Sequence, residues 1–519
     1  MYNPSLPRRP FLVATLVLAL LAAAWLAGSV YPRPTLGQQL ATSDTDPAAW
    51  AIEISPEQLV FDNRPVDPQL KAILDRAKGR PARQGGGGWG DLADLRRDWF
   101  WSQRAYPLDS IPADANLKAL EYVGREMTAL DLQQTWQALG PGPIQDGAIG
   151  IYQCPGDDCD MWRGPTTGRI KAIVFNPQNP NIVYVASGGG GIWKSTDGGA
   201  SYTPLTDNQP TQAFHSLVLD PTNPNIIYAG TGEIGGMYGL GILKSTNGGA
   251  SWTLVGRDLL EGLVVSAIIV HPTQPNIVYA AAANAAHGDR RGLPRERRSV
   301  LRSTDGGLNW ASLAHCDDCY GFSDLVMEDA NPQILYAAAG EFGIVKTTDG
   351  GTSWAKLTNG LPDRGFGRIE LGIGRGGGSG VIYAGYDAKV SVQGQIQAWG
   401  LVYKSSDHGA SWQRLDQTPN YCSSQCWYDN IIVVHPTDPN TVLIGGNFFD
   451  STPDSQADGR VLASTDGGAN WFDMTPGLAL NRAVHADMHA ISFRPGNPNE
   501  IWIGNDGGIY RSLDGGQTW

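Results

Sequence analysis

The stretch Ser195-Thr-Asp-Gly-Gly-Ala-Ser-Tyr202 decides the fold, because its pattern Ser/Thr-x-Asp-x-Gly-x-x-aromatic occurs seven times. The six later copies each end on Trp, and the second has Asn in place of Asp. The Asp or Asn positions are Asp197, Asn247, Asp305, Asp349, Asp407, Asp466 and Asp514, spaced 50, 58, 44, 58, 59 and 48 residues apart. Repeats of this length with strand-like sequence between them indicate the blades of a β-propeller.

The residue types of the repeat explain its structure. Its glycines permit the positive φ angles of a tight hairpin turn. Its carboxylate accepts backbone N–H groups of the same turn, and its aromatic ring packs between neighbouring sheets. We therefore expect the seven Asp or Asn side chains to be structural and not catalytic.

Each repeat also contains sequence for four short strands, for which Ile268–Pro272, Ile277–Ala280, Gly241–Lys244 and Trp252–Val255 are examples of the first to the fourth. Four antiparallel strands per repeat form one blade. The predicted fold is therefore all-β, a seven-bladed propeller of four-stranded blades over residues 135–519, preceded by a small helical extension over residues 31–134.

The seventh repeat ends at Trp519 and has no fourth strand of its own. Thr135–Leu139 resembles the strands that follow the other boxes, so we expect it to pair with the seventh blade and close the ring. A chain truncated at its C-terminus is the other explanation, and the two are compatible.

The N-terminus predicts export. Arg8 and Arg9 precede an uncharged apolar run from Phe11 to Val30, which is the layout of a signal peptide or of an uncleaved signal anchor. Residues 1–30 are assigned to this segment, and both outcomes stay open. The expected location is extracytoplasmic, either secreted or anchored to the cell envelope.

Composition restricts the partners. The net charge of −13 argues against nucleic acid, because binding phosphates requires a basic face. We expect no cofactor. Contact with a membrane is expected only through the N-terminal segment if it is not cleaved.

The six cysteines fall into three local pairs: Cys154 with Cys159, Cys316 with Cys319, and Cys422 with Cys426. In an oxidising compartment such pairs usually close small loops as disulfides, and we expect all three to be bonded. A zinc site and free thiols are the alternatives.

Polar residues at one rim of the ring are the candidate site. In an antiparallel blade, the first strand begins and the second strand ends on the same face. Glu233, Asn505 and Asp506 follow second strands, Asp429 and His489 lie near the starts of first strands, and a long loop over 386–400 is expected at the same rim. Such a ring of polar groups is needed for a ligand site, although an ordinary solvated channel has one too.

The densest group is His485-Ala-Asp487-Met-His489. If this segment is an extended strand, its period of two places His485, Asp487 and His489 on one face. The three residues are therefore a weak candidate metal site, and channel packing or ligand contact are the other interpretations.

The repeat resembles the Asp-box, or BNR, family, which includes xyloglucan-type glycosidases, sialidases, sortilin-type receptors and a photosystem assembly factor. Over roughly Trp99 to Trp519 the chain resembles large bacterial exported BNR-repeat proteins, which are loosely described as glycosyl hydrolases. The resemblance rests on Gly230-Thr-Gly-Glu233, Tyr428-Asp-Asn430, His485–His489 and Asn505-Asp-Gly-Gly508. It implies the propeller fold and a ligand at the rim.

Resemblance to the xyloglucan-cleaving members implies two catalytic acids, and neither is in place. Gly188 stands where the first acid is expected, and Asn505 stands at the second, with Asp506 beside it. A two-carboxylate mechanism needs both groups. No Arg-Ile-Pro motif of sialidases precedes the repeats, and the Cys-rich module of sortilin-type receptors is absent from the sequence.

The sequence thus predicts an exported propeller that binds a glycan or protein ligand, either an extracellular polysaccharide or a cell-envelope protein. Asp429, His485, His489 and Asn505 are the candidate contacts. The alternative is a xyloglucanase-like glycoside hydrolase using Asp506, Asp487 and Glu233. Whether the chain is an enzyme is left open.

Overall fold

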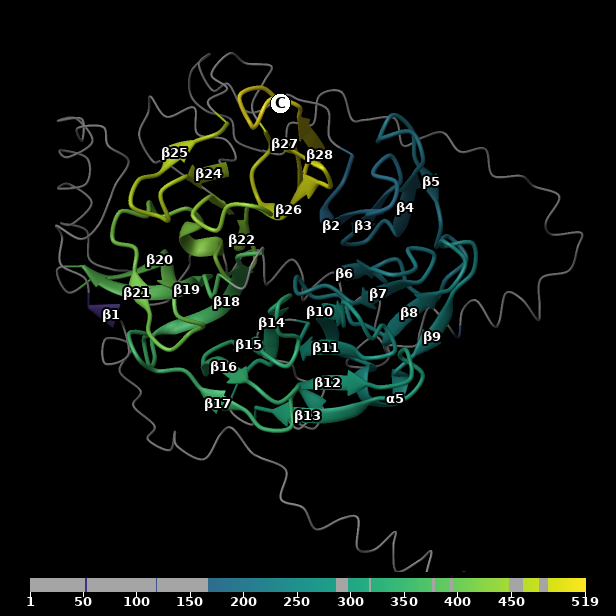
Figure 1. Cartoon of the computed structure of the whole chain (residues 1–519), viewed down its shortest axis with the longest axis horizontal. Coiled ribbons are helices and arrows are strands. Elements are labelled where there is room, and N and C mark those ends of the chain that lie inside the picture. The colour runs from purple at the N-terminus through teal and green to yellow at the C-terminus, as the bar shows by residue number, and fades with distance from the viewer. Residues whose placement is uncertain are drawn as a thin grey trace, which may run out of the picture.

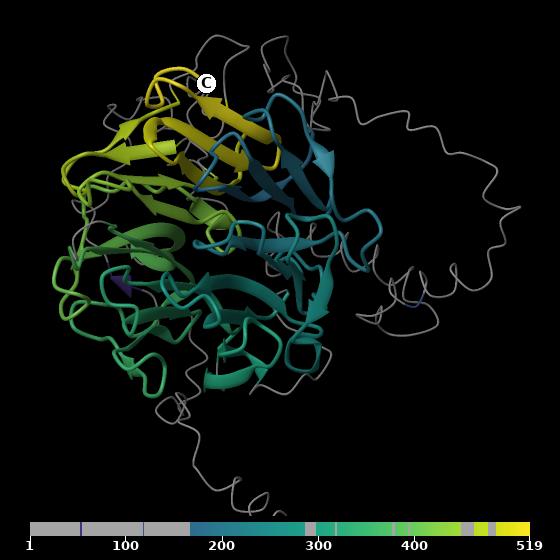
Figure 2. The ribbon, with the colours of Figure 1, turned by 45° about the vertical axis from the view of Figure 1, so that its right-hand side comes forward.

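The computed structural model describes residues 52–53, 118, 167–285, 297–316, 319–375, 379–392, 395–447, 461–475 and 484–519. Seven antiparallel sheets are arranged around a central axis, so the predicted all-β, seven-bladed propeller is confirmed (Figures 1 and 2). No helix among these residues is long and apolar enough to span a bilayer. Residues 1–30 and the segment 135–139, for which we predicted an export signal and a ring-closing strand, lie outside the described residues.

Blades one to three each have four strands in chain order. Their bounds are β2 (Ile170–Phe175), β3 (Val183–Ser187), β4 (Ile192–Ser195), β5 (Thr203–Pro204), β6 (Phe214–Leu219), β7 (Ile227–Thr231), β8 (Ile242–Ser245), β9 (Thr253–Val255), β10 (Val264–Val270), β11 (Val278–Ala283), β12 (Ser299–Ser303) and β13 (Ala311–His315). A short helix, α5 (Arg257–Leu260), links blades two and three.

Blades four to seven continue the pattern. Their bounds are β14 (Phe322–Met327), β15 (Leu335–Ala339), β16 (Gly343–Thr347), β17 (Ala355–Lys356), β18 (Phe366–Ile373), β19 (Ile382–Val392), β20 (Gln395–Ser405), β21 (Gln413–Arg414), β22 (Ile431–Val434), β23 (Val442–Gly445), β24 (Val461–Ser464), β25 (Phe472–Asp473), β26 (Met488–Arg494), β27 (Asn497–Asn505) and β28 (Gly508–Ser512). The 3-10 turn η5 (Ser423–Gln425) precedes β22. The seventh sheet has three strands among the described residues.

Two features differ from the sequence predictions. The predicted loop over 386–400 is wrong for its described residues, because 386–392 extend β19 and 395–400 extend β20 as paired strands. The strand β1 (Ile52–Glu53) lies in the extension expected to be helical, and it pairs in parallel with β19 through Ile52 and Val390. Of the remaining extension, only the helical Lys118 is described.

The repeat forms the predicted hairpin turn. In the first copy, Asp197 Oδ1 accepts the N–H of Ser201 at 2.9 Å, and the Ser195 hydroxyl accepts the N–H of Gly199 at 2.8 Å. Gly198 and Gly199 have φ angles of 71° and 90°, which side chains rarely adopt. The exposed carboxylate is therefore held by its own turn.

The blades are joined by a recurring contact that the sequence analysis did not anticipate. A buried Tyr on the second strand donates its hydroxyl to a carbonyl of the next blade, as Tyr228 does to Gly306 at 2.9 Å and Tyr279 does to Gly350 at 3.0 Å. A third-strand cation reaches the same carbonyl, as Lys244 does at 2.6 Å. At the junction of blades seven and one, Arg511 donates to Gly198 O at 3.0 Å.

The cysteine pairs that the structure describes are bonded as predicted. Cys316 is joined to Cys319, and Cys422 is joined to Cys426. The structure does not test the remaining predicted pair, because Cys154 and Cys159 both lie outside the described residues. A disulfide between Cys154 and Cys159 therefore stays a prediction.

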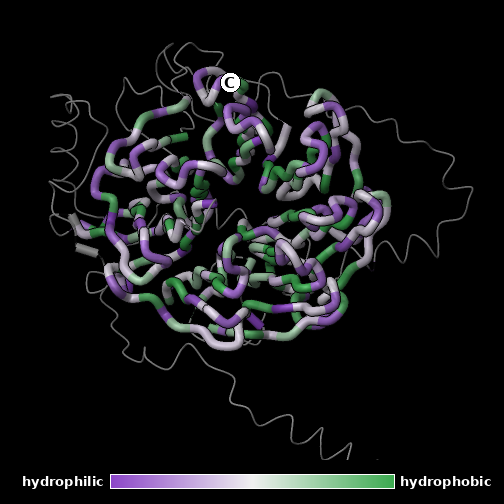
Figure 3. The backbone as a smooth tube through the Cα atoms, in the orientation of Figure 1, coloured by the Kyte–Doolittle hydropathy of each residue, from purple (hydrophilic) through white to green (hydrophobic). Residues whose placement is uncertain are grey.

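The first strand of every blade faces the axis, and neighbouring first strands contact each other around the ring, including β26 with β2. The ring is therefore closed by packing. Hydrophobic residues run along the strands, whereas the outer turns are largely hydrophilic (Figure 3). Because the first strands begin and the second strands end on one face, that rim can collect side chains from several blades.

Candidate functional site

A buried ion pair lies at the centre of the candidate site. Lys171, in the first strand of blade one, places its Nζ 3.0 Å from Glu233 Oε1, which follows β7 of blade two. Both side chains are almost fully buried, with exposed fractions of 2% and 1%. Burial raises the pKa of Glu233, but Lys171 and Arg169 outweigh it and hold that pKa below its usual value. Burial lowers the pKa of Lys171.

His489 connects this pair to blade seven. Its Nε2 lies 2.6 Å from Asp506 Oδ1, and its Nδ1 lies 3.2 Å from Lys171 Nζ. Since an ammonium group can only donate, Nδ1 must accept from Lys171, and Nε2–H must donate to Asp506. Burial and the Lys171 charge lower the pKa of His489 to about 3, although Asp506 opposes the shift. The ring is therefore neutral and is held in one tautomer.

Lys171, Glu233, His489, Asp506 and Arg169 form one cluster of polar contacts, and Asp506 lies at its partly exposed end. Its Oδ1 also accepts from Arg169 Nε at 2.9 Å, and 24% of its side chain is exposed. Burial alone would raise the pKa of Asp506, but the hydrogen bond from His489 and the charge of Arg169 lower it well below the usual range. Asp506 therefore stays ionised and faces solvent together with Arg169, whose side chain is 34% exposed.

The ring of Tyr428 forms the floor beneath these cations. Lys171 Nζ lies 3.9 Å and Arg169 Cζ lies 5.1 Å from its centroid, within the range of cation–π attraction. The ring also meets His489 edge-on at 4.8 Å. Its hydroxyl is buried and has no hydrogen-bond partner among the described residues.

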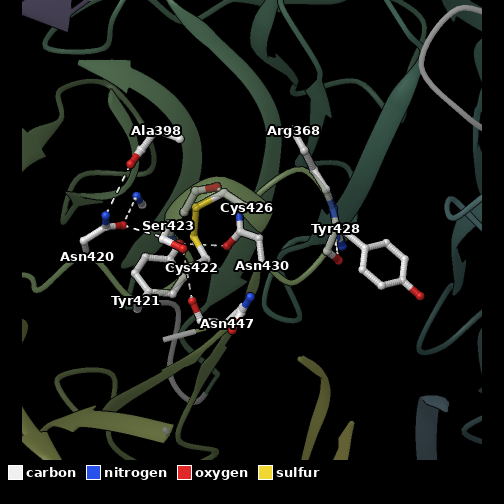
Figure 4. Close-up of a disulfide and its surroundings, with 12 residues drawn as sticks. Arg368, Ala398, Asn420, Tyr421, Cys422, Ser423, Cys426, Tyr428, Asn430 and Asn447 are labelled. Atoms are coloured by element: carbon white, nitrogen blue, oxygen red, sulfur yellow. Dashed lines mark hydrogen bonds between the residues drawn. A yellow bond between two sulfur atoms is a disulfide. The ribbon is translucent and has the colours of Figure 1, made fainter. Parts of the chain in front are cut away.

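A disulfide-bonded turn presents Tyr428. Cys422 and Cys426 are bonded across η5, and the Tyr428 side chain points away from this bridge (Figure 4). Arg368 of blade five donates from its Nη1 to the Tyr428 carbonyl. The bridge and this hydrogen bond together fix the backbone from which the ring projects.

Two further carboxyl groups lie behind His489. Asp429 Oδ1 is 3.7 Å from His489 Nδ1, and Asp487 is a like-charged neighbour of Asp429. Burial, and then the neighbouring Asp487 charge, raise the pKa of Asp429 well above its usual value, and burial raises that of Asp487. Burial and the nearness of two carboxyl groups both disfavour the ionised form here.

Asn505 belongs to the turn that carries Asp506, and His485 lies beside that turn. Asn505 Nδ2 donates to the His485 carbonyl at 2.8 Å, and its Oδ1 accepts the N–H groups of Gly507 and Gly508. Its amide is therefore used to shape the turn that carries Asp506. His485 packs its ring against Gly507 and is partly exposed.

The assumption behind the metal hypothesis is wrong. The strand β26 begins at Met488, and Asp487 has a φ of 65°, so His485 and Asp487 do not alternate with His489 along a strand. No group of three or more His, Cys, Asp or Glu within the described ranges is arranged to hold a metal ion.

The position of Gly188 is also informative. A Cβ at this residue would lie 2.9 Å from Arg169 Cδ and 3.5 Å from Glu233 Cγ. The space around Gly188 is thus taken by Arg169 and Glu233, and an acidic side chain here would displace the guanidinium.

Below the rim, the channel is polar and encloses about 280 Å³ that water can enter. Its lining includes Lys171, His215, Asp324, Glu370 and His489. Burial raises the pKa of Asp324 to about 6 and that of Glu370 to about 8. Burial lowers the pKa of His215 well below its usual value. The channel therefore continues the chain of perturbed groups that begins at the rim.

The structure thus brings together Glu233, Asp429, Asp487, His489 and Asp506 from blades two, six and seven. The sequence analysis missed Arg169 and Arg368 as members of the site, and it named Tyr428 only within the motif Tyr428-Asp-Asn430. A signal for both arginines is present, because Arg169-Ile-Lys171 and Arg368-Ile-Glu370 place charges at alternate positions at the starts of first strands. In these otherwise apolar strands, alternate residues point into the channel.

Comparison with known proteins supports the fold. No family model matches the chain, and no curated protein matches it. Among solved structures, it is similar to an ancestral GH74 enzyme, with a TM-score of 0.50 and 19% identity over 67% of this chain and 45% of that one. The GH74 xyloglucanase from Xanthomonas campestris gives 0.49 and 19%, over 68% and 53%. YCF48 from Cyanidioschyzon merolae gives 0.46 and 14%, over 68% and 97%.

The chain spans about half the length of the two GH74 structures. At 19% identity, the similarity to the ancestral GH74 enzyme shows a shared fold and nothing about a shared activity.

Proposed function

We propose that this chain is an extracytoplasmic binding protein whose ligand, a glycan or a protein, contacts the rim at the exposed Arg169–Asp506 edge of the cluster. One observation carries the proposal: blades one, two, six and seven together bury Lys171, Glu233, His489 and Asp429 at this edge. None of these residues belongs to an Asp-box turn.

Burying charged groups is costly, and replacing such pairs by apolar residues is often neutral or stabilising. Stability of the ring therefore does not require the cluster. Clusters of perturbed titratable groups at the mouth of a cavity are typical of functional sites. The two disulfides support an oxidising compartment outside the cytoplasm.

Glycoside hydrolysis is the second candidate, and one observation favours it. Asp487 and Asp506 lie in the same cluster with pKa values shifted in opposite directions, upward for Asp487 and downward for Asp506. A protonated carboxyl group beside an ionised one is the pairing that glycosidic cleavage uses. In this alternative Asp487 is the acid, Asp506 the base or nucleophile, and Glu233 an electrostatic partner of Lys171.

The test is a glycan array, an immobilised peptide array and a polysaccharide-hydrolysis assay, all on the full chain. We expect Asp506→Asn to weaken ligand capture at least tenfold, because it removes the exposed charge but keeps an acceptor for His489. The control is Asp349→Asn, which makes the same chemical change in a box turn and should leave capture unchanged.

Asp506→Asn is preferred to Asp506→Ala because Ala would leave Arg169 and His489 without their partner. Capture that survives Asp506→Asn and Asp487→Asn unchanged would overturn the proposed site. Release of reducing ends, lost in both variants, would favour the hydrolase over the binding protein.

A further inference from the structure

The turn over residues 422–428 of blade six connects a disulfide to the cluster. Cys422 and Cys426 are bonded, and the N–H of Gln425 donates to the Cys422 carbonyl at 3.0 Å. The N–H of Tyr428 then donates to the Gln425 carbonyl at 2.7 Å. The disulfide and the backbone of Tyr428 are thus joined through one residue, and a change in the bridged loop is transmitted to Tyr428.

The ring of Tyr428 extends from this turn, away from the bridge, to three other blades (Figure 4). It lies under Lys171 and Arg169 of blade one and meets His489 of blade seven edge-on. A Cβ placed on Gly235 of blade two would lie 3.2 Å from Tyr428 Cε2, so the ring packs closely there too. Its position therefore affects both cations of the cluster.

Tyr428 contributes its ring to the cluster and not its hydroxyl group. The hydroxyl is buried and has no hydrogen-bond partner among the described residues, whereas cation–π attraction requires only the face of the ring. Lys171 Nζ, 3.9 Å from the ring centroid, also contacts Glu233 and His489. A displaced ring would therefore disturb the contacts of the whole cluster, which makes Tyr428 a positioning residue.

The disulfide between Cys316 and Cys319 has a different setting. Its two cysteines pack in the core between blades three and four, and the Cys319 carbonyl accepts from Arg298 of blade three. The sequence separations of the two bridges are 3 and 4 residues, and none of the four cysteines is more than 3% exposed. The pair is therefore a matched control for the loss of a buried, short-range disulfide.

Both bridges close very short loops. A disulfide stabilises a fold mainly by restricting the unfolded chain, and this effect grows with the length of the closed loop. The ring itself is held by the box turns and by the tyrosine contacts between blades. Neither bridge should therefore be needed for the chain to fold into a propeller.

We propose that oxidation of Cys422 and Cys426 completes the rim site. The bond sets the ring of Tyr428 beneath the cations of Arg169 and Lys171, and the reduced chain folds without this support. Two thiols become one disulfide, and their two electrons and two protons pass to a disulfide oxidant such as oxidised glutathione, which becomes two thiols. The inference rests on the proposed function and adds its regulation, because ligand capture then requires an oxidising compartment.

The bond acts once, while the protein folds. Thiol–disulfide exchange requires a thiolate to reach a sulfur atom, and Cys422 and Cys426 are both 0% exposed in the folded chain. The folded, oxidised protein should therefore resist dithiothreitol, whereas the unfolded protein should be reduced by it.

Two double variants of the full chain separate this role from the ordinary stabilising effect of a disulfide. The bridge variant is Cys422→Ala/Cys426→Ala, and the control variant is Cys316→Ala/Cys319→Ala. Urea unfolding should show that both variants are folded and that their losses of stability are similar, because each loses a bridge across a short loop.

The first readout is NMR of the His489 imidazole, which needs no ligand. The ring current of Tyr428 shifts the imidazole proton resonances, because the two ring centroids are 4.8 Å apart. We expect the shift to be lost in the bridge variant and in Tyr428→Leu. It should be retained in the control variant and in Tyr428→Phe, which keeps the ring.

The second readout is capture on the glycan and peptide arrays that test the proposed function. The bridge variant and Tyr428→Leu should weaken capture about fivefold or more, the range of a lost cation–π contact, while the control variant and Tyr428→Phe stay within about twofold. The unsubstituted chain refolded with dithiothreitol should match the bridge variant. The same chain refolded with oxidised glutathione should match the untreated protein.

A bridge variant that keeps both the His489 shift and full capture would overturn the proposal, as would equal loss of capture in the bridge and control variants. A bridge variant that unfolds while the control variant stays folded would also overturn it, because the bond would then hold the fold and not the site. If Asp506→Asn leaves capture unchanged, the proposed edge fails, but the His489 readout still tests the role of the bond.

Discussion

Two sets of carboxyl groups in this molecule have opposite environments. Those of the box turns are exposed, and hydrogen bonds from their own turns lower their pKa values, to about 2 at Asp305, Asp407 and Asp466. Those of the rim are fully or mostly buried, and their pKa values move in both directions. A carboxylate held by neighbours in sequence is part of the scaffold. One held by residues of other blades is placed where the assembled ring can use it.

The largest effect on stability is expected at the buried Lys171–Glu233 pair, which lies on the rim side of this comparison. Lys171→Met leaves Glu233 buried without the ammonium group 3.0 Å away. Breaking a buried pair costs about 3–5 kcal/mol, so the free energy of unfolding in urea should fall by about that amount. The double variant Lys171→Met/Glu233→Gln should recover part of the loss.

The same variant should alter His489, because the charge that repels its proton is gone. NMR of the imidazole should show its pKa rising from about 3 toward the usual value. If Lys171→Met alone lowers the free energy of unfolding by less than about 1 kcal/mol, Glu233 does not need its ammonium partner. That result would contradict the description of the two residues as a buried ion pair.

A smaller effect is expected in the turns. Asp349→Ala removes the acceptor for Thr347 Oγ1, Ser353 N and Ser353 Oγ. We expect the free energy of unfolding to fall by about 1–2 kcal/mol, as for the loss of a helix cap. The chain contains its own control, because Asn247 keeps equivalent contacts in the second box. Asp349→Asn should therefore cost only about 0.5 kcal/mol.

The contribution of the Asp349 carboxylate to stability depends on pH in a direction that its pKa determines. The turn holds the pKa of Asp349 at about 2, below the unfolded value of 3.8. Its contribution to stability is therefore complete above pH 4 and is lost as the pH falls toward 2. The difference between the protein and Asp349→Asn should shrink over that interval. A difference that is constant from pH 5 to pH 2 would show that the charge is irrelevant to the turn.

The smallest effect is expected at Asp429 and Asp506, whose pKa values are shifted in opposite directions. Asp429 has a raised pKa, so the protein loses stability as the pH rises from the unfolded value of 3.8 through the raised one. Asp429→Asn carries its own amide hydrogens and should gain relative stability over that range, on the order of 1 kcal/mol. Asp506→Asn should behave oppositely, because its carboxylate has a lowered pKa. Urea unfolding at several pH values measures the change in stability of both variants. If the two changes have the same sign, Asp429 and Asp506 do not have pKa values shifted in opposite directions.

The fold could be predicted from sequence because each box is a contiguous turn that stabilises itself. Ser195 and Gly199 are near neighbours in the chain, so one copy of the pattern already contains the hydrogen bonds that the structure shows. Blade topology then predicts that Glu233 and Asp506 end strands at the same rim.

The pairing within the site could not be predicted, since Arg169 and Asp506 are 337 residues apart and meet only when the ring closes. The alternation expected for His485–His489 failed because the backbone turns at Asp487 before β26 begins. The hairpin of β19 and β20 was missed because Gly and Gln in 393–397 favour a loop on composition, while the cross-strand pairing that decides otherwise is not visible in one sequence.

The Arg169–Asp506 pair also joins the first blade to the last. Thr167 N donates to Gly507 O at 2.9 Å beside it, and Arg511 reaches Gly198 from the outer side. A ligand bound to both residues would connect blades one and seven across the seam, the place where the ring closes. Binding to the closed form alone stabilises it by about 2.7 kcal/mol at a concentration one hundred times the dissociation constant. Resistance of the seam to heat or to mechanical force would therefore report whether the site is occupied.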